Sequence, residues 1–334
     1  MKNTPSKDKD NQTKIREVII IGSGPAGYSA AIYSSRDQLQ PLLFAGEKAN
    51  GQLMYTTEVE NFAGFPEGVM GPKLMMNMRA QAERFGTEII DRNITRVDFS
   101  QRPFKVWQGD DIYQARGIII ATGAESITLG LENEEKLLGR GVSTCAVCDA
   151  AFFREKVVYV VGGGDSAVED TMALVKFASK VYMVVRRDQL RASKIMQERV
   201  RSNKKVKLLW NTEIIRIYGK DKVERLLLKN NQTNHKDKVK ADGLFFAIGH
   251  KPITKFMDNQ VDLDNKGYIL TPLNGLMKQV NMHAQWLAGY PTKTSVEGVF
   301  AAGDVVDFRY RQAITAAAYG SMAALDVEKW LESR

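Results

Sequence analysis

Cysteine and histidine are scarce in this sequence. Its 334 residues include two cysteines, Cys145 and Cys148, and three histidines, His235, His250 and His283. Two cysteines separated by two residues exclude a framework of structural disulfides. Two thiols are also too few for a zinc site unless a histidine joins them, and none has close ligand spacing to the pair. The pair therefore predicts redox chemistry, and we expect no bound metal.

Long hydrophobic runs are also missing. The apolar runs Val18–Ile21 and Val157–Val161 are far shorter than the roughly 20 residues that span a bilayer. Residues 1–14 are polar and lysine-rich with no apolar stretch behind them, so they lack the middle region of a secretory signal. We expect a soluble, cytoplasmic protein with a disordered tail over residues 1–14 and no membrane segment.

The charge balance is basic, with 47 lysines and arginines against 39 acidic residues and a net charge of +8. This charge alone could indicate a nucleic-acid partner. Solvating lysines in the tail and arginines with local phosphate roles account for it better, so we expect no nucleic acid. The length and a hydrophobic content of 44% predict about two domains with an ample core.

A glycine-rich turn follows the first apolar run. The run Val18–Ile21 reads as a strand buried on both faces, Gly22–Gly27 spells G-S-G-P-A-G, and the small residues of 28–35 predict a helix. In such a turn the first glycine permits the tight bend, the second lets backbone amides approach a pyrophosphate, and the third lets helix and strand touch. The helix N-terminus then faces the anion. Strand, turn and helix together predict a dinucleotide site.

The same pattern occurs a second time, from Val157–Val161 through Gly162–Ala167 into a predicted helix at 165–177. The next predicted strand, Val181–Val185, is followed by Arg186 and Arg187, with Arg191 close behind. An NAD site usually has an acidic residue there, whereas arginines suit the 2′-phosphate of NADPH through forked, charge-assisted hydrogen bonds. We infer NADPH; the alternative is a solvated basic turn.

A third element, 298–304, is an apolar strand that ends in Gly303 and Asp304. Its carboxylate could accept a hydrogen bond from a ribityl hydroxyl. The helix predicted from Arg311 onward could direct its N-terminus at the pyrimidine end of a flavin. The alternative is an ordinary strand and a packed amphipathic helix.

The order of the three elements predicts the architecture. The second glycine unit is complete in itself yet lies between the first unit and Asp304, so it looks like an inserted domain. We therefore predict an α/β fold with two Rossmann-like dinucleotide-binding domains, the NADPH domain being inserted into a discontinuous FAD domain. The predicted bounds are 15–124 and 251–334 for the FAD domain and 125–250 for the NADPH domain, with crossings near 121–123 and 247–252.

The cysteine pair reads Cys-Ala-Val-Cys-Asp over residues 145–149. If Cys148 begins a helical turn, the amides of that turn would favour its thiolate. Asp149 is then placed to shuttle the proton that exchange requires. The alternatives are a helix cap for Asp149 and a buried, reduced pair for the cysteines.

The pair precedes the second nucleotide strand closely, so thiols and NADPH share one domain. One flavin face cannot easily serve both nicotinamide and thiols at once. We therefore hypothesise that the inserted domain rotates about its two glycine-containing crossings.

From residue 17 to residue 331 the chain closely resembles the low-molecular-weight thioredoxin reductases of bacteria, plants and fungi. The resemblance includes both glycine turns, the segments 51–53 and 57–62, the cysteine motif 145–149, and the segments 186–188 and 310–313. It implies a homodimer, FAD and NADPH, a redox disulfide in the inserted domain, domain rotation, and thioredoxin as the electron acceptor. It also implies that Cys145 attacks the substrate disulfide and that Cys148 lies nearer the flavin.

The motifs described above and the resemblance give two sets of expected cofactor contacts, of which Gln52, Asn61 and Ile94 are implied by the resemblance alone. For FAD they are Gly22, Ser23, Gly24, Pro25, Ala26, Ala45, Gly46, Gly51, Gln52, Asn61, Ile94, Gly123, Gly303, Asp304, Arg311, Gln312 and Ala313. For NADPH they are Gly163, Gly164, Asp165, Ser166, Arg186, Arg187, Arg191, Ile248 and Gly249.

The chain departs from the family pattern at several positions. Ala150 replaces a usual glycine, Val185 stands where many members have histidine, and Asn50 stands where glycine is common. Tyr319 and Ser321 replace glycine and cysteine, and the connection over 271–290 is longer than usual. Two other functions stay open: reduction of a different small disulfide carrier, and a flavin-bound redox sensor without turnover.

Overall fold

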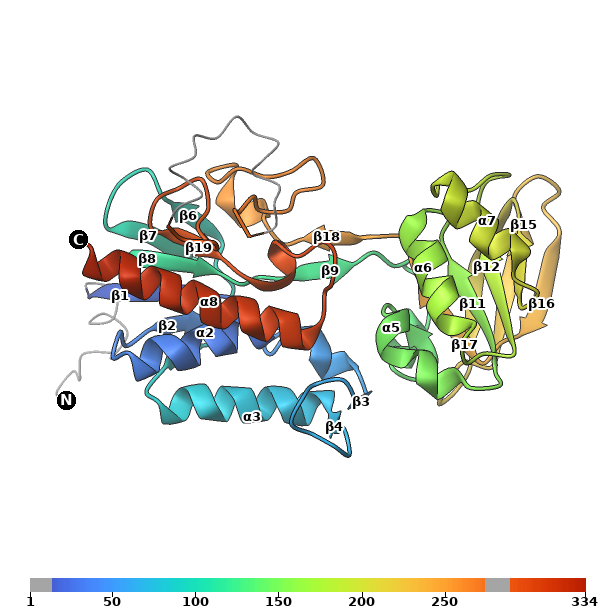
Figure 1. Ribbon diagram of the computed structural model, residues 1–334, viewed down its shortest axis with the longest axis horizontal. Helices are drawn as coiled ribbons and strands as arrows, with labels where there is room; N and C mark the ends of the chain where they lie inside the picture. Colours follow the sequence, from blue (N-terminus) through green and yellow to red (C-terminus); the bar gives the residue numbers. More distant parts are fainter. Residues whose placement is uncertain (1–13, 274–288) are drawn as a thin grey trace, which may run out of the picture. The chain divides into compact units, whose positions relative to one another are not determined.

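The computed structural model describes residues 14–273 and 289–334, which form an α/β protein (Figure 1). Contacts divide the chain into two units. The first comprises Met1–Met54, Phe62–Glu125 and Lys251–Arg334, and the second comprises Tyr55–Asn61 and Ser126–His250. The second unit is thus inserted into the first. The predicted tail, except Lys14, and most of the long connection over 271–290 lie outside the described residues.

The first unit is built on a seven-stranded sheet with the order β5-β2-β1-β8-β7-β6, in which β19 also pairs with β8. The strands are β1 Ile15–Ile21, β2 Leu42–Phe44, β5 Glu88–Ile90, β6 Arg96–Asp98, β7 Phe104–Gln108, β8 Asp111–Ile120 and β19 Val299–Ala301. Strands β5, β2, β1, β8 and β19 pair in parallel, and β6 and β7 add an antiparallel edge. The residues around the first glycine turn therefore form a parallel sheet, as the sequence predicts.

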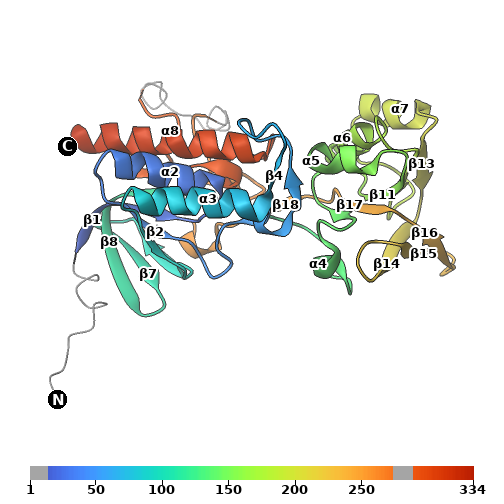
Figure 2. The same cartoon turned by 90° about the horizontal axis from the view of Figure 1, so that it is seen from below.

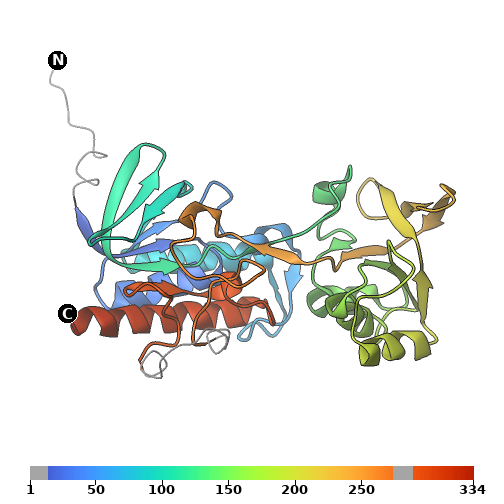
Figure 3. The same ribbon diagram turned by 90° about the horizontal axis from the view of Figure 1, so that it is seen from above.

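Helices α2 Pro25–Arg36, α3 Gly71–Arg84 and α8 Ala313–Glu332 lie side by side on one face of this sheet (Figure 2). Val18 and Ile20 point into the core beneath these helices, whereas Ile19 and Ile21 belong to the core on the opposite face. Burial on both faces explains the continuous apolar run, because neither side of the strand meets water. Figure 3 shows α8 running along the sheet from another side.

The second unit has a five-stranded parallel sheet with the order β10-β17-β11-β12-β13 and a three-stranded antiparallel sheet β14-β15-β16. The strands are β10 Val142–Ser143, β11 Val157–Val161, β12 Lys180–Val184, β13 Val206–Leu209, β14 Thr212–Tyr218, β15 Arg225–Asn230, β16 Lys236–Lys240 and β17 Gly243–Phe246. Helices α6 Asp165–Leu174 and α7 Lys194–Ser202 cover one face of the parallel sheet and β14–β16 the other. Val158 and Val160 face the helices, and Tyr159 and Val161 face the small sheet.

Short elements complete the two units. They are η1 Gln52–Tyr55, β3 Glu58–Val59, β4 Val69–Met70, β9 Ala124–Ser126, α4 Glu134–Leu137, α5 Ala146–Asp149, η2 Ala150–Phe153, β18 His250–Pro252, η3 Lys255–Met257 and η6 Gly303–Val305. Strands β9 and β18, which fall near the two crossings predicted from the sequence, pair with each other as a two-stranded sheet.

The elements differ from the sequence expectations mainly at their ends. The helix expected over 165–177 ends at Leu174, and the strand expected over 181–185 is shifted to Lys180–Val184. The segment Tyr55–Asn61 groups with the second unit, although the predicted boundary placed it in the first. Across the described parts of the chain, no helix has the length and apolar character that a membrane crossing requires.

Candidate functional site

The three glycines of the first turn have three different environments. Gly22 has φ +111°, and a Cβ there would lie 2.2 Å from the carbonyl oxygen of Ala121. A Cβ at Gly27 would lie 1.9 Å from the carbonyl oxygen of Gly22, whereas one at Gly24 would meet no atom within 4 Å. Helix α2 begins directly afterwards, at Pro25. The turn therefore leaves open space for an anion beside the start of α2.

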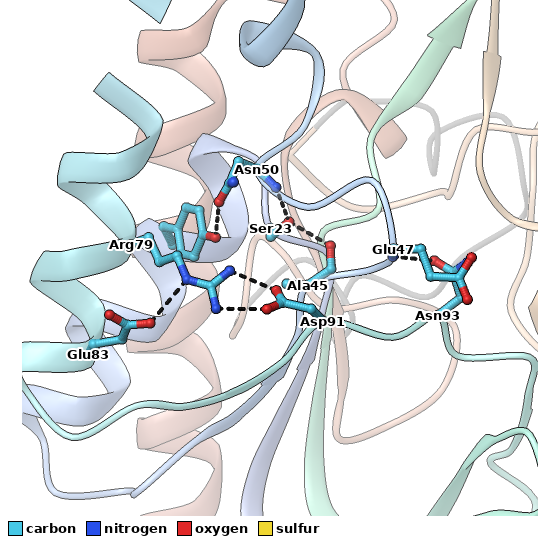
Figure 4. Close-up of polar contacts among 9 residues, drawn as sticks. Ser23, Ala45, Glu47, Asn50, Arg79, Glu83, Asp91 and Asn93 are labelled. Carbon is cyan, nitrogen blue, oxygen red and sulfur yellow. Dashed lines mark hydrogen bonds and ion pairs between the residues drawn. The ribbon is translucent and has the colours of Figure 1, made fainter. Parts of the chain in front are cut away.

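A segment that follows strand β2 is held against this turn. The Ser23 hydroxyl donates to the Ala45 carbonyl at 2.6 Å and accepts the Asn50 N–H at 2.8 Å. Figure 4 shows these two contacts converging on Ser23. The Gln52 side-chain amide donates to the carbonyl of Ala124, the first residue of β9. The structure thus brings Ser23, Ala45 and Asn50 together at the glycine turn, two of which, Ser23 and Ala45, are predicted FAD contacts.

The sequence did not predict the contacts made in this region by Tyr28, Asn50, Arg79 and Asp91. The Tyr28 hydroxyl donates to Asn50 Oδ1. Arg79 on α3 makes a two-pronged ion pair with Asp91, at 2.7 and 3.0 Å (Figure 4). The hydrogen bonds from Arg79 to Asp91 raise the pKa of the guanidinium, while burial opposes the rise. The departure at Asn50 from the family's glycine was the signal in the sequence that could have indicated this network.

Asp304 follows strand β19 in η6 and carries a buried oxygen. Its Oδ1 atom has no hydrogen-bond partner among the described residues. Burial raises the pKa of Asp304 to about 7; neighbouring Asp307 adds to the rise, and Arg311 opposes it. A buried acceptor without a donor is costly, which makes this atom suited to a donor on a bound ligand.

Asp307 shapes the segment before helix α8. Its carboxylate accepts the backbone N–H groups of Arg309, Tyr310 and Arg311, at 2.8 to 2.9 Å. Arg311 has φ +50°, and Gln312 then caps α8 through a reciprocal capping box with Thr315. The carboxylate therefore fixes where α8 begins, and with it the predicted contacts Arg311, Gln312 and Ala313.

The remaining predicted FAD contacts divide into two groups. Ile94 is buried in the core of the first unit, and Gly46, Gly51, Gly123 and Gly303 all have positive φ. Asn61 is exposed and groups with the second unit, next to the boundary at Phe62.

The second glycine turn has the same geometry, except that its third small residue is Ala167 where the first turn has Gly27. Gly162 has φ +149°, and a Cβ there would lie 2.7 Å from the Ala167 methyl group, whereas one at Gly164 would meet nothing within 4 Å. A Cβ at Gly162 would also lie 2.5 Å from the Ala247 carbonyl oxygen. Ile248 and Gly249, which follow that residue, therefore stand at the same edge of the sheet as the turn.

The arginine loop is attached to this second turn. The Gly163 carbonyl accepts the Arg191 N–H at 2.6 Å. Asp165, the first residue of α6, accepts both the N–H and the hydroxyl of Ser193 at 2.9 Å, and these bonds lower its pKa. All three predicted clamp residues, Arg186, Arg187 and Arg191, are exposed. Their guanidinium groups are therefore accessible to a phosphate.

Val185 contributes packing at this turn. It is buried, and its Cγ1 lies 3.2 Å from the position of a Cβ at Gly163. A larger polar side chain at position 185 could fit only if the packing against Gly163 changed.

Cys145 and Cys148 form a disulfide, which excludes the reduced pair as the form seen here. The expected helical turn starting at Cys148 is wrong: α5 begins at Ala146, with Cys145 as its N-cap. The Cys148 N–H therefore points at Cys145 Sγ, 3.2 Å away, and the Ser143 hydroxyl accepts the Cys145 N–H at 3.0 Å. Amides at the start of the turn thus favour a thiolate on Cys145, not on Cys148.

Asp149 ends α5 next to the disulfide. Burial raises the pKa of its carboxyl group, while a hydrogen bond with Ser143 opposes the rise. Although Asp149 is also the N-cap residue of η2, its side chain makes no capping hydrogen bond. This geometry favours a proton-transfer role over the alternative of a helix cap. Within residues 14–273 and 289–334, no group of three or more His, Cys, Asp or Glu side chains could hold a metal ion.

Comparison with known proteins agrees with these features. Residues 16–320 match the family described as pyridine nucleotide-disulphide oxidoreductase. A thioredoxin reductase of Chlamydia pneumoniae is 50% identical over 322 residues, covering 94% of this chain and 98% of that protein.

Two solved structures are also similar. The thioredoxin reductase from Giardia duodenalis matches with a TM-score of 0.85 and 40% identity, over 96% of this chain and 100% of the other. The enzyme from Streptococcus pyogenes gives a TM-score of 0.85 and 38% identity, over 96% and 99%. With its two glycine turns and its disulfide, the chain belongs to the thioredoxin reductases of the pyridine nucleotide-disulphide oxidoreductase family.

Proposed function

We propose that this protein uses NADPH to reduce the disulfide of a thioredoxin, with FAD and the Cys145–Cys148 pair as intermediate carriers. The observation that carries the proposal is the disulfide on the same unit as the second glycine turn and its arginine loop. The relatives' name, thioredoxin reductase, supports thioredoxin as the acceptor.

Enzymes of this family use FAD and NADPH. The first unit fits FAD because Gly24 faces open space at the start of α2 and Asp304 Oδ1 is a buried acceptor. We infer that the backbone N–H groups of Ser23, Gly24 and Ala26 hold the pyrophosphate, with Pro25, which has no N–H, beside it, and that Asp304 accepts from a ribityl hydroxyl. When bound, FAD supplies a two-electron carrier between nicotinamide and sulfur.

The second unit fits NADPH. We infer that Gly163, Gly164 and Ser166 surround the pyrophosphate at the start of α6, and that Arg186, Arg187 and Arg191 bind the 2′-phosphate. The hydrogen bonds from Arg191 to Gly163 and from Ser193 to Asp165 support this, because they attach the arginine loop to the turn. Ile248 and Gly249 would border the site at the sheet edge.

The sulfur chemistry follows from the pair itself. Two electrons and two protons convert the Cys145–Cys148 disulfide into two thiols. The Cys145 thiolate then attacks one sulfur of the substrate disulfide, forming a mixed disulfide and releasing the other substrate sulfur as a thiolate. Cys148 attacks Cys145 Sγ, which restores the intramolecular disulfide and releases the second substrate thiol. The amides of α5 favour this assignment because they stabilise a thiolate at Cys145.

Asp149 would handle the protons of this exchange. Its raised pKa brings the protonated carboxyl closer to physiological pH, so that it can give a proton to a leaving thiolate and take one back. It follows Cys148 directly in the chain.

We also infer that the second unit rotates between two states, one that would place the nicotinamide at the flavin and one that would place the disulfide there. Supporting this, the segment Ser126–His250 contains both the thiols and the nucleotide turn, and it joins the first unit through β9 and β18. The homodimer and the cytoplasmic location remain predictions from the resemblance and from the sequence.

Replacement of either cysteine should separate the two half-reactions. We expect Cys145→Ser and Cys148→Ser each to lower thioredoxin reduction by at least about a thousandfold, because an exchange step needs both sulfurs. NADPH should still bleach the flavin absorbance in both variants. A stopped-flow and steady-state comparison with thioredoxin, a glutaredoxin-like protein and a peroxiredoxin checks this. Turnover with a different carrier, or flavin bleaching without turnover in wild type, would favour the two alternative functions.

The arginine loop should determine the choice of nucleotide. Replacing both Arg186 and Arg187 by Gln removes forked donors to the 2′-phosphate, and we expect the KM for NADPH to rise roughly ten- to a hundredfold. The KM for NADH, which lacks that phosphate, should stay within about threefold. Arg225→Gln, an exposed arginine on β15 of the same unit, is the matched control. Equal losses with both nucleotides would contradict the assignment.

Asp304 should make the stability of the FAD-free protein depend on pH. Its pKa is raised from 3.8 to about 7, so its protonated form stabilises the fold fully below pH 3.8, and that stabilisation is lost as the pH rises through 7. Asp304→Asn lacks this titration. In urea unfolding, we expect the variant to be more stable than wild type at pH 8. Its advantage in the free energy of unfolding should be about 2 kcal/mol smaller at pH 5.5. A difference in unfolding free energy between variant and wild type that does not change with pH would refute this prediction.

Rotation should appear as two interdomain distances. Asp110 in the first unit and Lys220 in the second are exposed turn residues, and both can be replaced by Cys for dye labelling in a Cys145→Ser, Cys148→Ser background. Single-molecule energy transfer should give two populations whose ratio changes when NADPH is added. A single distance under all conditions would exclude the rotation.

A further inference from the structure

Asn50 combines an unusual backbone with a buried side chain. It has φ +74°, a region that L-residues rarely adopt, and it is only 8% exposed. Glycine would take this backbone without strain, and asparagine is among the few other residues that tolerate it. The side chain must therefore contribute something that glycine would not.

That contribution is a hydrogen bond to helix α2. The Tyr28 hydroxyl donates to Asn50 Oδ1, and Tyr28 is fully buried. Burial raises the pKa of Tyr28 to about 12, with the Arg79 guanidinium opposing the rise. The hydroxyl therefore stays protonated at physiological pH and can donate to Asn50 Oδ1.

The Ser23 hydroxyl is fully used within the protein. It gives its one proton to the Ala45 carbonyl and accepts the Asn50 N–H (Figure 4). Consequently the side chain of Ser23 has no proton left to donate to a phosphate, and only its backbone N–H can serve a ligand. Its role is to attach the segment 45–50 to the glycine turn.

The next residue along the chain lies against the turn. Gly51 has φ +70°, and a Cβ there would be 3.1 Å from the Cα of Gly24, the glycine that faces open space. The segment 45–51 therefore forms a wall beside the proposed pyrophosphate position. Asn50 connects this wall to α2 through Tyr28 and to the turn through Ser23.

We propose that Asn50 is a positioning residue for FAD: by binding Tyr28 and Ser23 it fixes the wall 45–51 before the cofactor arrives and thereby slows FAD release. This inference rests on the proposed FAD role of the first glycine turn. Preorganisation of this kind acts on affinity because the loop has no ordering entropy left to lose on binding.

The test uses the full-length protein loaded with FAD. Asn50→Gly keeps the left-handed backbone and the N–H to Ser23 and removes only the carboxamide, whereas Tyr28→Phe removes the opposite partner. We expect each variant to release FAD roughly five times faster, and the double variant to release it at the same rate as the singles, because all three lose one bond. Release is followed by flavin fluorescence after dilution, with NADPH affinity of the second unit as an internal reference.

Asn133→Gly is the matched control, since Asn133 also has φ +74° but belongs to the second unit. It should leave FAD release unchanged. Release rates within twofold of wild type for both Asn50→Gly and Tyr28→Phe, or additive effects in the double variant, would overturn the inference while FAD still binds. A wild-type protein that cannot be loaded with FAD would instead overturn the proposed function, and this inference with it.

Discussion

The structure depends on the absence of side-chain volume at two glycine turns. In each unit a central strand ends and a helix begins, and the carbonyl group of the residue that follows a neighbouring strand, Ala121 or Ala247, lies 2.2 or 2.5 Å from where a Cβ would stand. Only because Gly22 and Gly162 lack that atom can three backbone segments converge, so that the first amides of α2 and α6 border open space. The helices then cover one sheet face, which forces the central strands to be apolar on both sides.

Aspartates attach functional segments to these turns in both units. In the first unit Asp307 accepts three consecutive backbone N–H groups and so determines where α8 begins. In the second, Asp165 accepts from Ser193 and holds the arginine loop beside Gly163. A carboxylate that accepts several backbone N–H groups orders a loop at a small cost in conformational entropy. Those N–H groups need hydrogen-bond partners in any case. The charged residues that follow are thereby positioned without being buried themselves.

The sequence predicted the repeated features well because they are local. Apolar runs, glycine spacing and the cysteine motif each occupy a few consecutive residues, and the disulfide and parallel sheets agree with them. The start of the helical turn was predicted wrongly, because four residues carry too little periodicity to distinguish Ala146 from Cys148 as its first residue. The bond from Tyr28 to Asn50 spans 22 positions and depends on how a loop folds back, which no local pattern records. In the sequence, Asn50 stands out only because glycine is common at this position in the family. Its positive φ and its bond from Tyr28 became known from the structure.

The third small residue of each glycine motif, Gly27 in the first unit and Ala167 in the second, explains why the two motifs are not interchangeable. A methyl group at Gly27 would lie 1.9 Å from the Gly22 carbonyl, so α2 must approach its strand more closely than a side chain allows. On its other side α2 meets α8 equally closely, since a Cβ at Gly320 would lie 2.0 Å from the Ala26 carbonyl. In the second unit the third small residue is Ala167, whose methyl group is accommodated beside Gly162. In the first unit α2 is therefore packed tightly between the strand end and α8. The hydrogen bond from Tyr28 to Asn50 attaches the wall 45–51 to this closely packed helix, and the bonds of Ser23 attach it to the turn.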